Sequence, residues 1–487
     1  MKALAALLAT ALLGGCASLV SPTQPTAASP ETASCARWFA QVDAAIDQAG
    51  VRDAETERVA GFAGLRVDRF TASLRDRASA SAAAFDTWLA RLQRLELDGR
   101  AFEIANLPRT AFPIGAAADA AAARRQTEQC AQAWRGPLQS DPALRSTLLE
   151  RAQVPDRYAT WQRAVGLYPL VRWPFFAGVQ NWQRSHEEAM SRWATSPAPT
   201  QRFVPVRAAP TMALRHDQPR DALGVPQFSD AEVAALLAAH APALEVETRV
   251  DADRFGALAW NGGAVPAVDN AAPPQAYQRI AYARYGDRVL VQLVYSFWFP
   301  ERPPLGRVDL LAGALDAVVL RVTLAPDDGR PLLVDTIHGC GCYHLFIPTA
   351  EVALRTPAPT DVEWAFTPTT LPALSPSQRI VVRLASATHY VVGVDRDGGA
   401  PGTPYVLREE QMLRALPTSA GASKSVFGPD GLVAGSERAE RWLFWPMGIA
   451  SAGAMRQWGH HATAFVGRRH FDDADLIERR FVIPALQ

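Results

Sequence analysis

The fold class of this chain is indicated first by the stretch Arg288-Val-Leu-Val-Gln-Leu-Val-Tyr-Ser-Phe-Trp-Phe299. It is rich in branched and aromatic residues, which suit the pleated surface of a β-sheet. Turn residues such as Asp327-Asp328-Gly329 separate it from similar stretches. We expect further strands at 317–324, 332–338, 361–366, 379–384 and 389–395. Because long helices do not alternate with these strands, the sheet is predicted to be mainly antiparallel.

The sequence before these strands has a helical pattern. Apolar residues such as Phe85, Trp88, Leu92 and Leu95 recur three and four positions apart, which is typical of the buried face of a helix in a bundle. The same pattern appears at 37–48, 66–77, 81–97, 118–134 and 142–152. We therefore predict an α+β protein, in which an N-terminal helical domain at 35–195 precedes a mainly antiparallel β-rich domain with a few helices.

A proline-rich segment with little periodicity, 196–228, is predicted to be the linker between these domains. The β-rich α+β domain then covers 229–487. Ser229 and Glu232 form a capping box at the start of its first helix. Two later helices are expected at 409–416 and 473–480.

The segment 165–182 differs from the other helical stretches, because it is apolar and is broken by Pro169 and Pro174. The prolines and Arg172 argue against a membrane span. Two interpretations stay open. The segment is either a bent, buried connection or a surface patch that enters lipid or contacts a partner, since Trp and Tyr suit interfaces.

Composition excludes several classes of function. The 487 residues are 48% hydrophobic and 20% charged, which is typical of a folded protein with two or three domains. The formal net charge is zero, so the basic surplus of a nucleic-acid binder is missing. Lys424 is the only lysine outside the leader, and it lies in no phosphate-binding loop, so no nucleotide ligand is expected.

The N-terminus has the order of an export signal. Lys2 precedes an apolar run at 3–13, which is shorter than the ~20 residues of a membrane span. The next residues, Leu13-Gly14-Gly15-Cys16, resemble the lipobox of bacterial lipoproteins. The resemblance implies that a signal peptide, 1–15, is removed and that Cys16 receives diacylglycerol and a further acyl chain such as palmitate.

The same resemblance implies a location. Ala17 follows Cys16 where inner-membrane lipoproteins usually carry Asp, so we expect anchoring in the outer membrane, on its periplasmic face. Residues 16–34 are rich in Ser, Pro, Thr and Ala, and they are predicted to form a flexible tether. The expected partners are the lipid membrane, through the acyl anchor, and an envelope protein.

Four cysteines remain after Cys16, and the periplasm favours disulfides. Cys35 and Cys130 both lie in predicted helices, so a bridge between them is the simplest pairing. Cys340 and Cys342 would then form a second, strained disulfide, because a ring that spans one glycine hardly reaches normal geometry. If they stay reduced, the two thiols can instead bind a soft metal or act as a thiol–disulfide pair.

The most unusual stretch is Asp335-Thr-Ile-His-Gly-Cys-Gly-Cys-Tyr-His344. On an extended strand its alternating His and Cys side chains would share one face, and two imidazoles with two thiolates suit zinc or copper. A tetrahedral site needs the chain to fold back, which Gly339 and Gly341 favour. The wider set of candidate metal ligands is His338, His344, His389, His460, His461 and His470.

Three functions follow as hypotheses. The first is a lipid-anchored periplasmic lipoprotein with a binding or envelope-structural role. The second is a metal-dependent, hydrolase-like enzyme, with Asp335 or Asp472 as the base, although Asp472 also suits a helix cap. The third is a thiol–disulfide protein. The second hypothesis requires His338 or His344 to lie near His389, His460 and His470.

Overall fold

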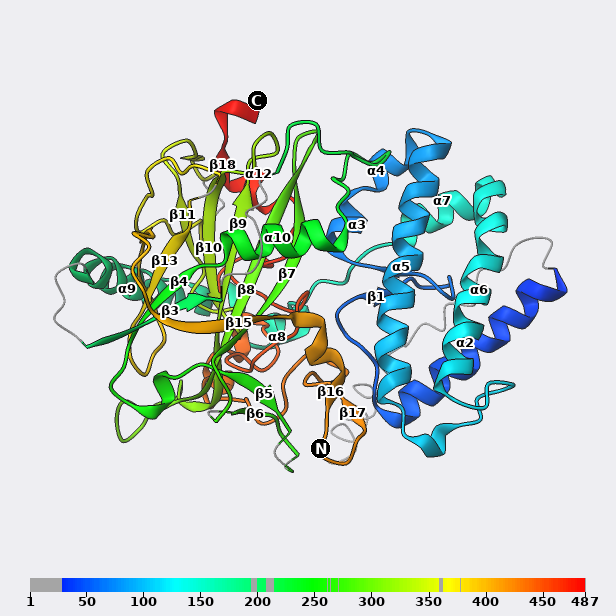
Figure 1. The fold of residues 1–487 in the computed structure, drawn as a ribbon, viewed down its shortest axis with the longest axis horizontal. Coiled ribbons are helices and arrows are strands. Elements are labelled where there is room, and N and C mark those ends of the chain that lie inside the picture. The colour runs from blue at the N-terminus through cyan, green and yellow to red at the C-terminus, as the bar shows by residue number, and fades with distance from the viewer. Residues whose placement is uncertain are drawn as a thin grey trace, which may run out of the picture.

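The structure is a computed structural model that describes residues 29–193, 199–206, 214–260, 262, 264–269, 271–358, 362–376 and 378–486. The signal peptide, Cys16 and most of the expected tether lie outside the described residues. A helical region at 30–192 precedes a large mixed sheet, so the predicted α+β class is confirmed. In Figure 1 the helices α2, α5, α6 and α7 lie on one side of the sheet and α9 on the other.

The helical region is built from long amphipathic helices with side-chain caps. Ser29, Ser81, Asp119 and Asp141 each accept a hydrogen bond from the first turn of the helix that follows. Its helices are α2 (Pro30–Ala49), α3 (Arg69–Ser73), α4 (Arg75–Ser79), α5 (Ala82–Asn106), α6 (Ala120–Ser140) and α7 (Pro142–Arg151). Their apolar faces share one core, in which Trp88 is fully buried.

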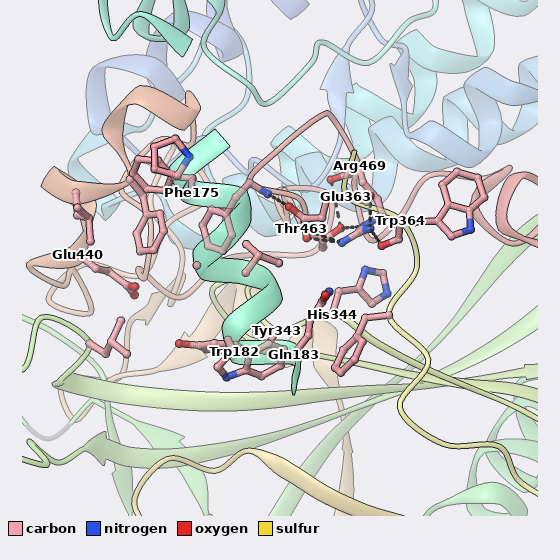
Figure 2. A pocket seen from close by; sticks show the side chains of 18 residues that line it. Phe175, Trp182, Gln183, Tyr343, His344, Glu363, Trp364, Glu440, Thr463 and Arg469 are labelled. Carbon is pink, nitrogen blue, oxygen red and sulfur yellow. Dashed lines mark hydrogen bonds and ion pairs between the residues drawn. The ribbon is translucent and has the colours of Figure 1, made fainter. Parts of the chain in front are cut away.

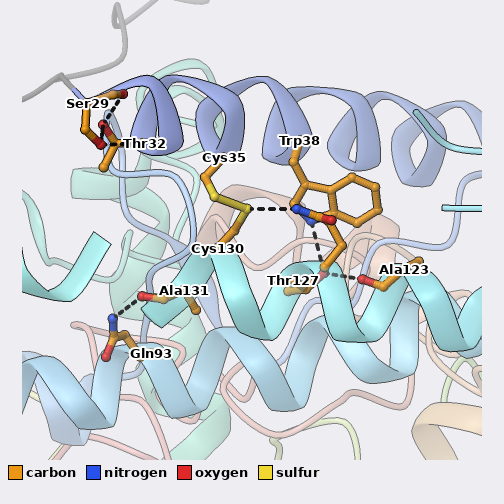
Figure 3. The surroundings of a disulfide bond; sticks show 10 residues. Ser29, Thr32, Cys35, Trp38, Gln93, Ala123, Thr127, Cys130 and Ala131 are labelled. Atoms are coloured by element: carbon orange, nitrogen blue, oxygen red, sulfur yellow. Dashed lines mark hydrogen bonds between the residues drawn. A yellow bond between two sulfur atoms is a disulfide. The ribbon is translucent and has the colours of Figure 1, made fainter. Parts of the chain in front are cut away.

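The predicted disulfide between Cys35 and Cys130 is present and joins α2 to α6 (Figure 3). It closes a sequence separation of 95 residues inside the helical core. Beside it, Trp38 donates a ring hydrogen bond of 3.2 Å to Thr127 (Figure 3). Covalent and polar contacts therefore fix the same helix pair.

The ten-stranded sheet has the order β11-β10-β9-β8-β7-β15-β3-β4-β13-β14. Most neighbours are antiparallel, and the parallel pairs are β7 with β15, β15 with β3, and β4 with β13. The strands are β3 (Thr200–Pro205), β4 (Ala243–Glu247), β7 (Gln275–Tyr285), β8 (Arg288–Arg302), β9 (Gly313–Leu324), β10 (Pro331–His338), β11 (Leu345–Pro348), β13 (Ile380–Leu384), β14 (Val391–Arg396) and β15 (Thr403–Glu409). The stretch that decided the fold class is β8, near the centre of the antiparallel part.

The structure differs from the expectations at several elements. The predicted helix 66–77 begins instead with the short strand β2 (Arg66–Val67), because Arg66 lies in a buried ion network. The described part of 361–366 forms no strand and contributes only a single bridge at Phe366. The helix at 409–416 is a 3-10 helix, Glu410–Ala415, and α12 (Leu476–Arg480) is shorter than predicted.

The segment predicted as a linker, 196–228, contributes a strand to the sheet. This strand, β3, pairs with β4 and β15. Leu223 and Val225, further along the same segment, are buried in the core of the helical region. The capping box of Ser229 and Glu232 is confirmed at the start of α10 (Asp230–His240).

The apolar segment 165–182 lies mostly in α9 (Tyr168–Arg192), with Pro169 in its first turn and Pro174 inside it. The side chains of Val165, Leu170 and Trp173 are 69%, 69% and 53% exposed, so a wholly buried connection is wrong. Among the described residues, no helix is long and apolar enough to cross a membrane. The structure thus gives a surface helix with an apolar outer side.

Candidate ligand-binding cavity

A cavity of about 480 Å³ lies between α9 and the loops that follow β10 and α11 (Glu440–Leu443) (Figure 2). Its volume falls in the range of small-molecule sites. The apolar lining comes from α9, from the loop between β8 and β9, from the segment after β11 and from the C-terminal segment that includes α11. These residues are Pro174, Phe175, Gly178, Val179, Trp182, Leu311, Trp364, Phe366, Leu443, Phe444 and Phe465.

Aromatic contacts hold the α9 wall in place. The Trp182 ring lies 4.7 Å from the His186 ring and 4.9 Å from the Tyr343 ring, measured between centroids. On the opposite side, Phe444 stacks on Phe465 at 4.4 Å and meets Phe175 at 5.5 Å. Burial lowers the pKa of His186 to about 4, so this imidazole is neutral and packs as an apolar group.

One end of the cavity carries a carboxylate whose hydrogen bonds are satisfied. Glu363 accepts bonds of 2.9 Å from the backbone N–H groups of Phe465 and Val466, and its other oxygen lies 3.2 Å from Arg469. Arg469 also donates to Thr463 (Figure 2). Burial raises the pKa of Glu363, while Arg469 acts against that rise. This end of the cavity is therefore a closed structural network.

The other end holds Glu440, which Figure 2 shows well apart from Glu363 and Arg469. The Glu440 residue is 3% exposed and lines the cavity. Within the described part of the chain, its carboxyl group has no hydrogen bond and no cation within 4.0 Å. Burial raises the pKa of Glu440 to about 7, although Arg438 and Arg302 oppose the rise. The carboxyl group is mostly buried and faces the cavity without a protein partner, which marks a place where a ligand group can bind.

Behind this end, two histidines share one buried carboxylate. Asp316 lies 2.9 Å from His389 Nδ1, 3.4 Å from His338 Nδ1 and 3.1 Å from Arg438 Nη2. Burial would raise the pKa of Asp316, but Arg438 and the histidines hold it well below its usual range. His389 also stacks on Phe299 at 3.9 Å. The structure thus brings together two of the candidate metal ligands, as partners of one aspartate.

The Asp335 and His344 side chains form a second, separate pair. His344 Nε2 lies 2.9 Å from Asp335, whose two oxygens also accept bonds from Arg321 at 2.9 and 2.6 Å. Burial lowers the pKa of His344 to about 3 despite this carboxylate. The Asp335 and His344 side chains are fully buried. The Asp335 carboxylate pairs with Arg321 and with the neutral His344, and it does not line the cavity, so it is not placed to act there as a base.

The remaining candidates lie elsewhere in the structure. His460 Nε2 is 2.6 Å from the Ala54 carbonyl oxygen, and burial lowers the pKa of His461 to about 3. His470 sits between Asp156 at 3.2 Å and Asp473 at 3.3 Å. Asp472 pairs with Arg69 at 3.2 Å, and the residue before α12 is Asp475, so Asp472 does not cap that helix. Among the described residues, no three His, Cys, Asp or Glu side chains are placed to hold a metal ion.

The two cysteines after β10 are free thiols, in contrast to the expected disulfide. The chain does not continue as a strand there, because Gly341 N–H donates to the His338 carbonyl and Gly341 has a φ of 90°. A side-chain hydrogen bond with Cys342 lowers the pKa of Cys340, and the same contact raises the pKa of Cys342. Both residues are under 9% exposed, which shields the sulfurs from exchange partners.

No family model, curated protein or solved structure matches this chain. The evidence on function therefore comes from the cavity itself. Part of the cavity wall comes from stretches that stand out in the sequence. The apolar segment 165–182 supplies Phe175 and Trp182, and the stretch 335–344 supplies Tyr343. Glu440 was not predicted, because it lies in no motif and becomes notable only through its burial.

Proposed function

We propose that this protein is a lipid-anchored lipoprotein of the bacterial envelope that binds an apolar small molecule in the cavity under α9. The observation that carries the binding role is the aromatic cavity itself, which has few polar groups and an unpartnered carboxyl group at one end. Binding sites of this kind are mostly apolar and hold a few polar groups that orient the ligand. The anchor rests on the lipobox at Cys16.

The surface beside the cavity supports a route for an apolar ligand. Leu443 lines the cavity and is 52% exposed, and Trp442 next to it is 71% exposed. Leu170 and Trp173 of α9 add exposed apolar area, and Phe175 of the same helix contacts Phe444. Apolar residues gathered beside a cavity are typical of binding surfaces.

The two enzymatic hypotheses receive no comparable support. A hydrolytic zinc site needs three protein ligands and an open position, and among the described residues no three His, Cys, Asp or Glu side chains are placed to hold a metal ion. A thiol–disulfide role needs an accessible thiolate, whereas Cys340 is 1% exposed.

The binding role is tested by filling the cavity. A Cβ at Gly178 meets nothing within 4 Å, so Gly178→Trp adds an indole to the cavity wall without a backbone clash. The matched control is Ala177→Trp, because Ala177 is the neighbouring exposed residue of α9 and does not line the cavity. Binding of a fluorescent apolar probe is expected to fall at least tenfold in Gly178→Trp and to stay unchanged in Ala177→Trp.

Equal probe binding in all three proteins would contradict the binding role. The anchor is tested separately, by labelling cells with radioactive palmitate. Cys16→Ser is expected to abolish the label and release the protein from the membrane fraction, whereas unchanged labelling would contradict the anchor. The two experiments are independent, so each half of the proposal can fail alone.

A further inference from the structure

The uncommitted carboxyl group of Glu440 indicates the chemistry of the ligand. Burying a polar group without a partner costs a few kcal/mol, so a native protein usually satisfies such a group or keeps it for a ligand. Glu363 shows that this cavity can satisfy a carboxylate, with backbone N–H groups and Arg469. Glu440 receives no such bonds within the described residues, although it is 3% exposed. The missing partner is therefore expected to come with the ligand.

The arginines near Glu440 are committed to other groups. Arg438 donates to Asp316 and to the Leu315 carbonyl, and Arg302 donates to the Tyr390 hydroxyl group and to the Thr388 carbonyl. Neither guanidinium lies within 4.0 Å of the Glu440 carboxyl group, and both act on it only at longer range. Glu440 therefore lacks a counter-ion of its own.

The charges that face Glu440 leave a net negative site when it ionises. They come from Arg438 on its own segment, Arg302 of β8, Asp316 of β9 and Asp309 of the loop between these strands. When Glu440 is ionised, the site contains two positive groups and three negative ones, Glu440 included, so its net charge is minus one. Burial raises the pKa of the nearby Tyr343 hydroxyl, and the hydrogen bond with Cys340 raises the pKa of Cys342, so both groups are neutral near pH 7. The same hydrogen bond lowers the pKa of Cys340, and ionisation of that thiol would only add to the negative excess. A bound anion would add to this excess, whereas a cation would neutralise it.

Aromatic rings next to Glu440 favour the same kind of ligand. Phe444 lies one turn beyond Glu440, and its N–H donates to the Glu440 carbonyl at 2.9 Å. Phe444 contacts Phe175, Tyr343 interacts electrostatically with Glu440, and all three rings line the cavity together with Glu440. Ring faces attract organic cations, and a carboxylate among aromatic rings is a site for an ammonium group.

From this arrangement we infer that the ligand carries an ammonium-type cation, which pairs with Glu440 while its apolar part lies against α9. This inference rests on the proposed binding function and adds the class of ligand. Because burial raises the pKa of Glu440 to about 7, the carboxylate is only partly ionised at neutral pH, and binding of a cation becomes stronger as the pH rises.

The test compares three probes with the same decyl chain: decyltrimethylammonium, decanol and decyl sulfate. Their affinities are measured by calorimetry, below the concentration at which micelles form, on the mature full-length protein. At pH 8 we expect the cation to bind at least tenfold more tightly than decanol, and decyl sulfate more weakly than either. Glu440→Gln should lower the affinity for the cation to about that for decanol and so remove the preference. The matched control is Glu437→Gln, an exposed carboxylate three residues away.

The wild-type protein gives a second measurement that needs no substitution. Its preference for the cation over decanol should shrink severalfold between pH 8 and pH 5.5. Equal affinities for the three probes, or an unchanged preference in Glu440→Gln, would overturn the inference. If decanol binding is still blocked by Gly178→Trp in that case, the proposed function stands. If Gly178→Trp weakens no probe, the proposed function fails as well.

Discussion

Buried carboxylates in the two regions of this protein are treated in opposite ways. In the helical region, Glu103 lies 2.6 Å from Arg66 and 3.2 Å from Arg100, and it also accepts a 3.0 Å bond from the Asp53 backbone N–H. In the cavity, the side-chain carboxyl group of Glu440 has no hydrogen bond within the described residues. Burial of a charged group therefore does not by itself identify a functional site. A buried carboxyl group indicates a binding site when the protein leaves it without hydrogen bonds.

The two carboxylates also differ in the direction of their pKa shifts. Burial would raise the pKa of Glu103, but Arg66 and Arg100 lower it to about 2. Burial dominates at Glu440 and raises its pKa to about 7. Glu103 thus stabilises the folded state in its charged form, whereas ionised Glu440 destabilises it.

The largest loss of stability is expected from a substitution in the buried ion network of Glu103, Arg66 and Arg100. Glu103→Ala removes a carboxylate that Arg66 and Arg100 share and leaves an excess of buried positive charge beside Glu96, which should lower the free energy of unfolding by about 3–5 kcal/mol. The control is Asp98→Ala in the same helix, whose pair with Arg94 is exposed and should contribute about 0.3–0.5 kcal/mol. Urea unfolding measures both variants. A loss below about 1 kcal/mol in Glu103→Ala would contradict this account of the network.

The second effect concerns the disulfide, which stabilises only the helical region. Replacing Cys35 and Cys130 together by Ala should cost about 2–5 kcal/mol, since the bridge closes a long loop of the unfolded chain. A reducing agent should destabilise the wild-type protein equally and leave the double variant unaffected, because Cys340 and Cys342 are already thiols. Thermal unfolding with and without reductant measures this. A further loss on reduction of the double variant would show a second bridge.

A third, smaller effect is the pH dependence that Glu440 introduces. From its ordinary pKa of 4.5 up to about 7, the folded state keeps a proton that the unfolded state releases, so stability falls as the pH rises through this window. The full loss is at most about 3 kcal/mol, from a shift of this size. Buried neutral histidines such as His186 and His240, with pKa values lowered to about 4, act in the opposite direction.

The contribution of Glu440 to the pH dependence is therefore measured as the difference in free energy of unfolding between Glu440→Gln and the wild type. The free energy of unfolding of Glu440→Gln minus that of the wild type should rise from pH 4.5 to pH 7. Glu437→Gln should show no such rise, because that carboxylate is exposed. Parallel curves for Glu440→Gln and the wild type would mean that Glu440 is not held in its protonated form.

The sequence predicts the fold better than the site. The apolar stretch at β8 is buried on both faces, and the helical stripe around Trp88 buries one face of α5, so local patterns suffice to identify them. The disulfide was predicted from two cysteines in helical stretches and from the oxidising compartment that the leader sequence predicts. In contrast, β3 was missed because it is a polar strand of six residues with few branched residues. The pairing of His389 with Asp316, 73 residues apart, depends on tertiary contacts that no local pattern encodes.

Glu440 shows the same limit more sharply. Its neighbours Arg438 and Arg441 suggest a solvated, charged surface, and nothing in the sequence indicates that its carboxyl group is buried. Burial arises because the short helix α11 packs against η5 (Trp445–Met447) and the cavity loops. Unpartnered groups of this kind become visible only once the chain is folded.

The smallest predicted effect compares two helical glycines, one in the core of the helical region and one at the cavity. Gly99 of α5 and Gly178 of α9 both lie inside helices of 25 residues, where Gly costs about 0.5–1 kcal/mol relative to Ala. A Cβ at Gly99 would lie 2.7 Å from the Arg66 guanidinium, which Glu103 holds in place, so Gly99→Ala should destabilise the protein by about 1–3 kcal/mol.

Gly178 has no such steric reason, because a Cβ there meets nothing within 4 Å. Gly178→Ala should therefore stabilise the protein by about 0.5–1 kcal/mol through the gain in helix propensity alone. Urea unfolding of both variants measures the opposite signs. If Gly178→Ala also loses stability, the glycine has a structural role in α9. If it gains stability, the helix retains a destabilising residue where it lines the cavity, as expected when that space is kept open for a ligand.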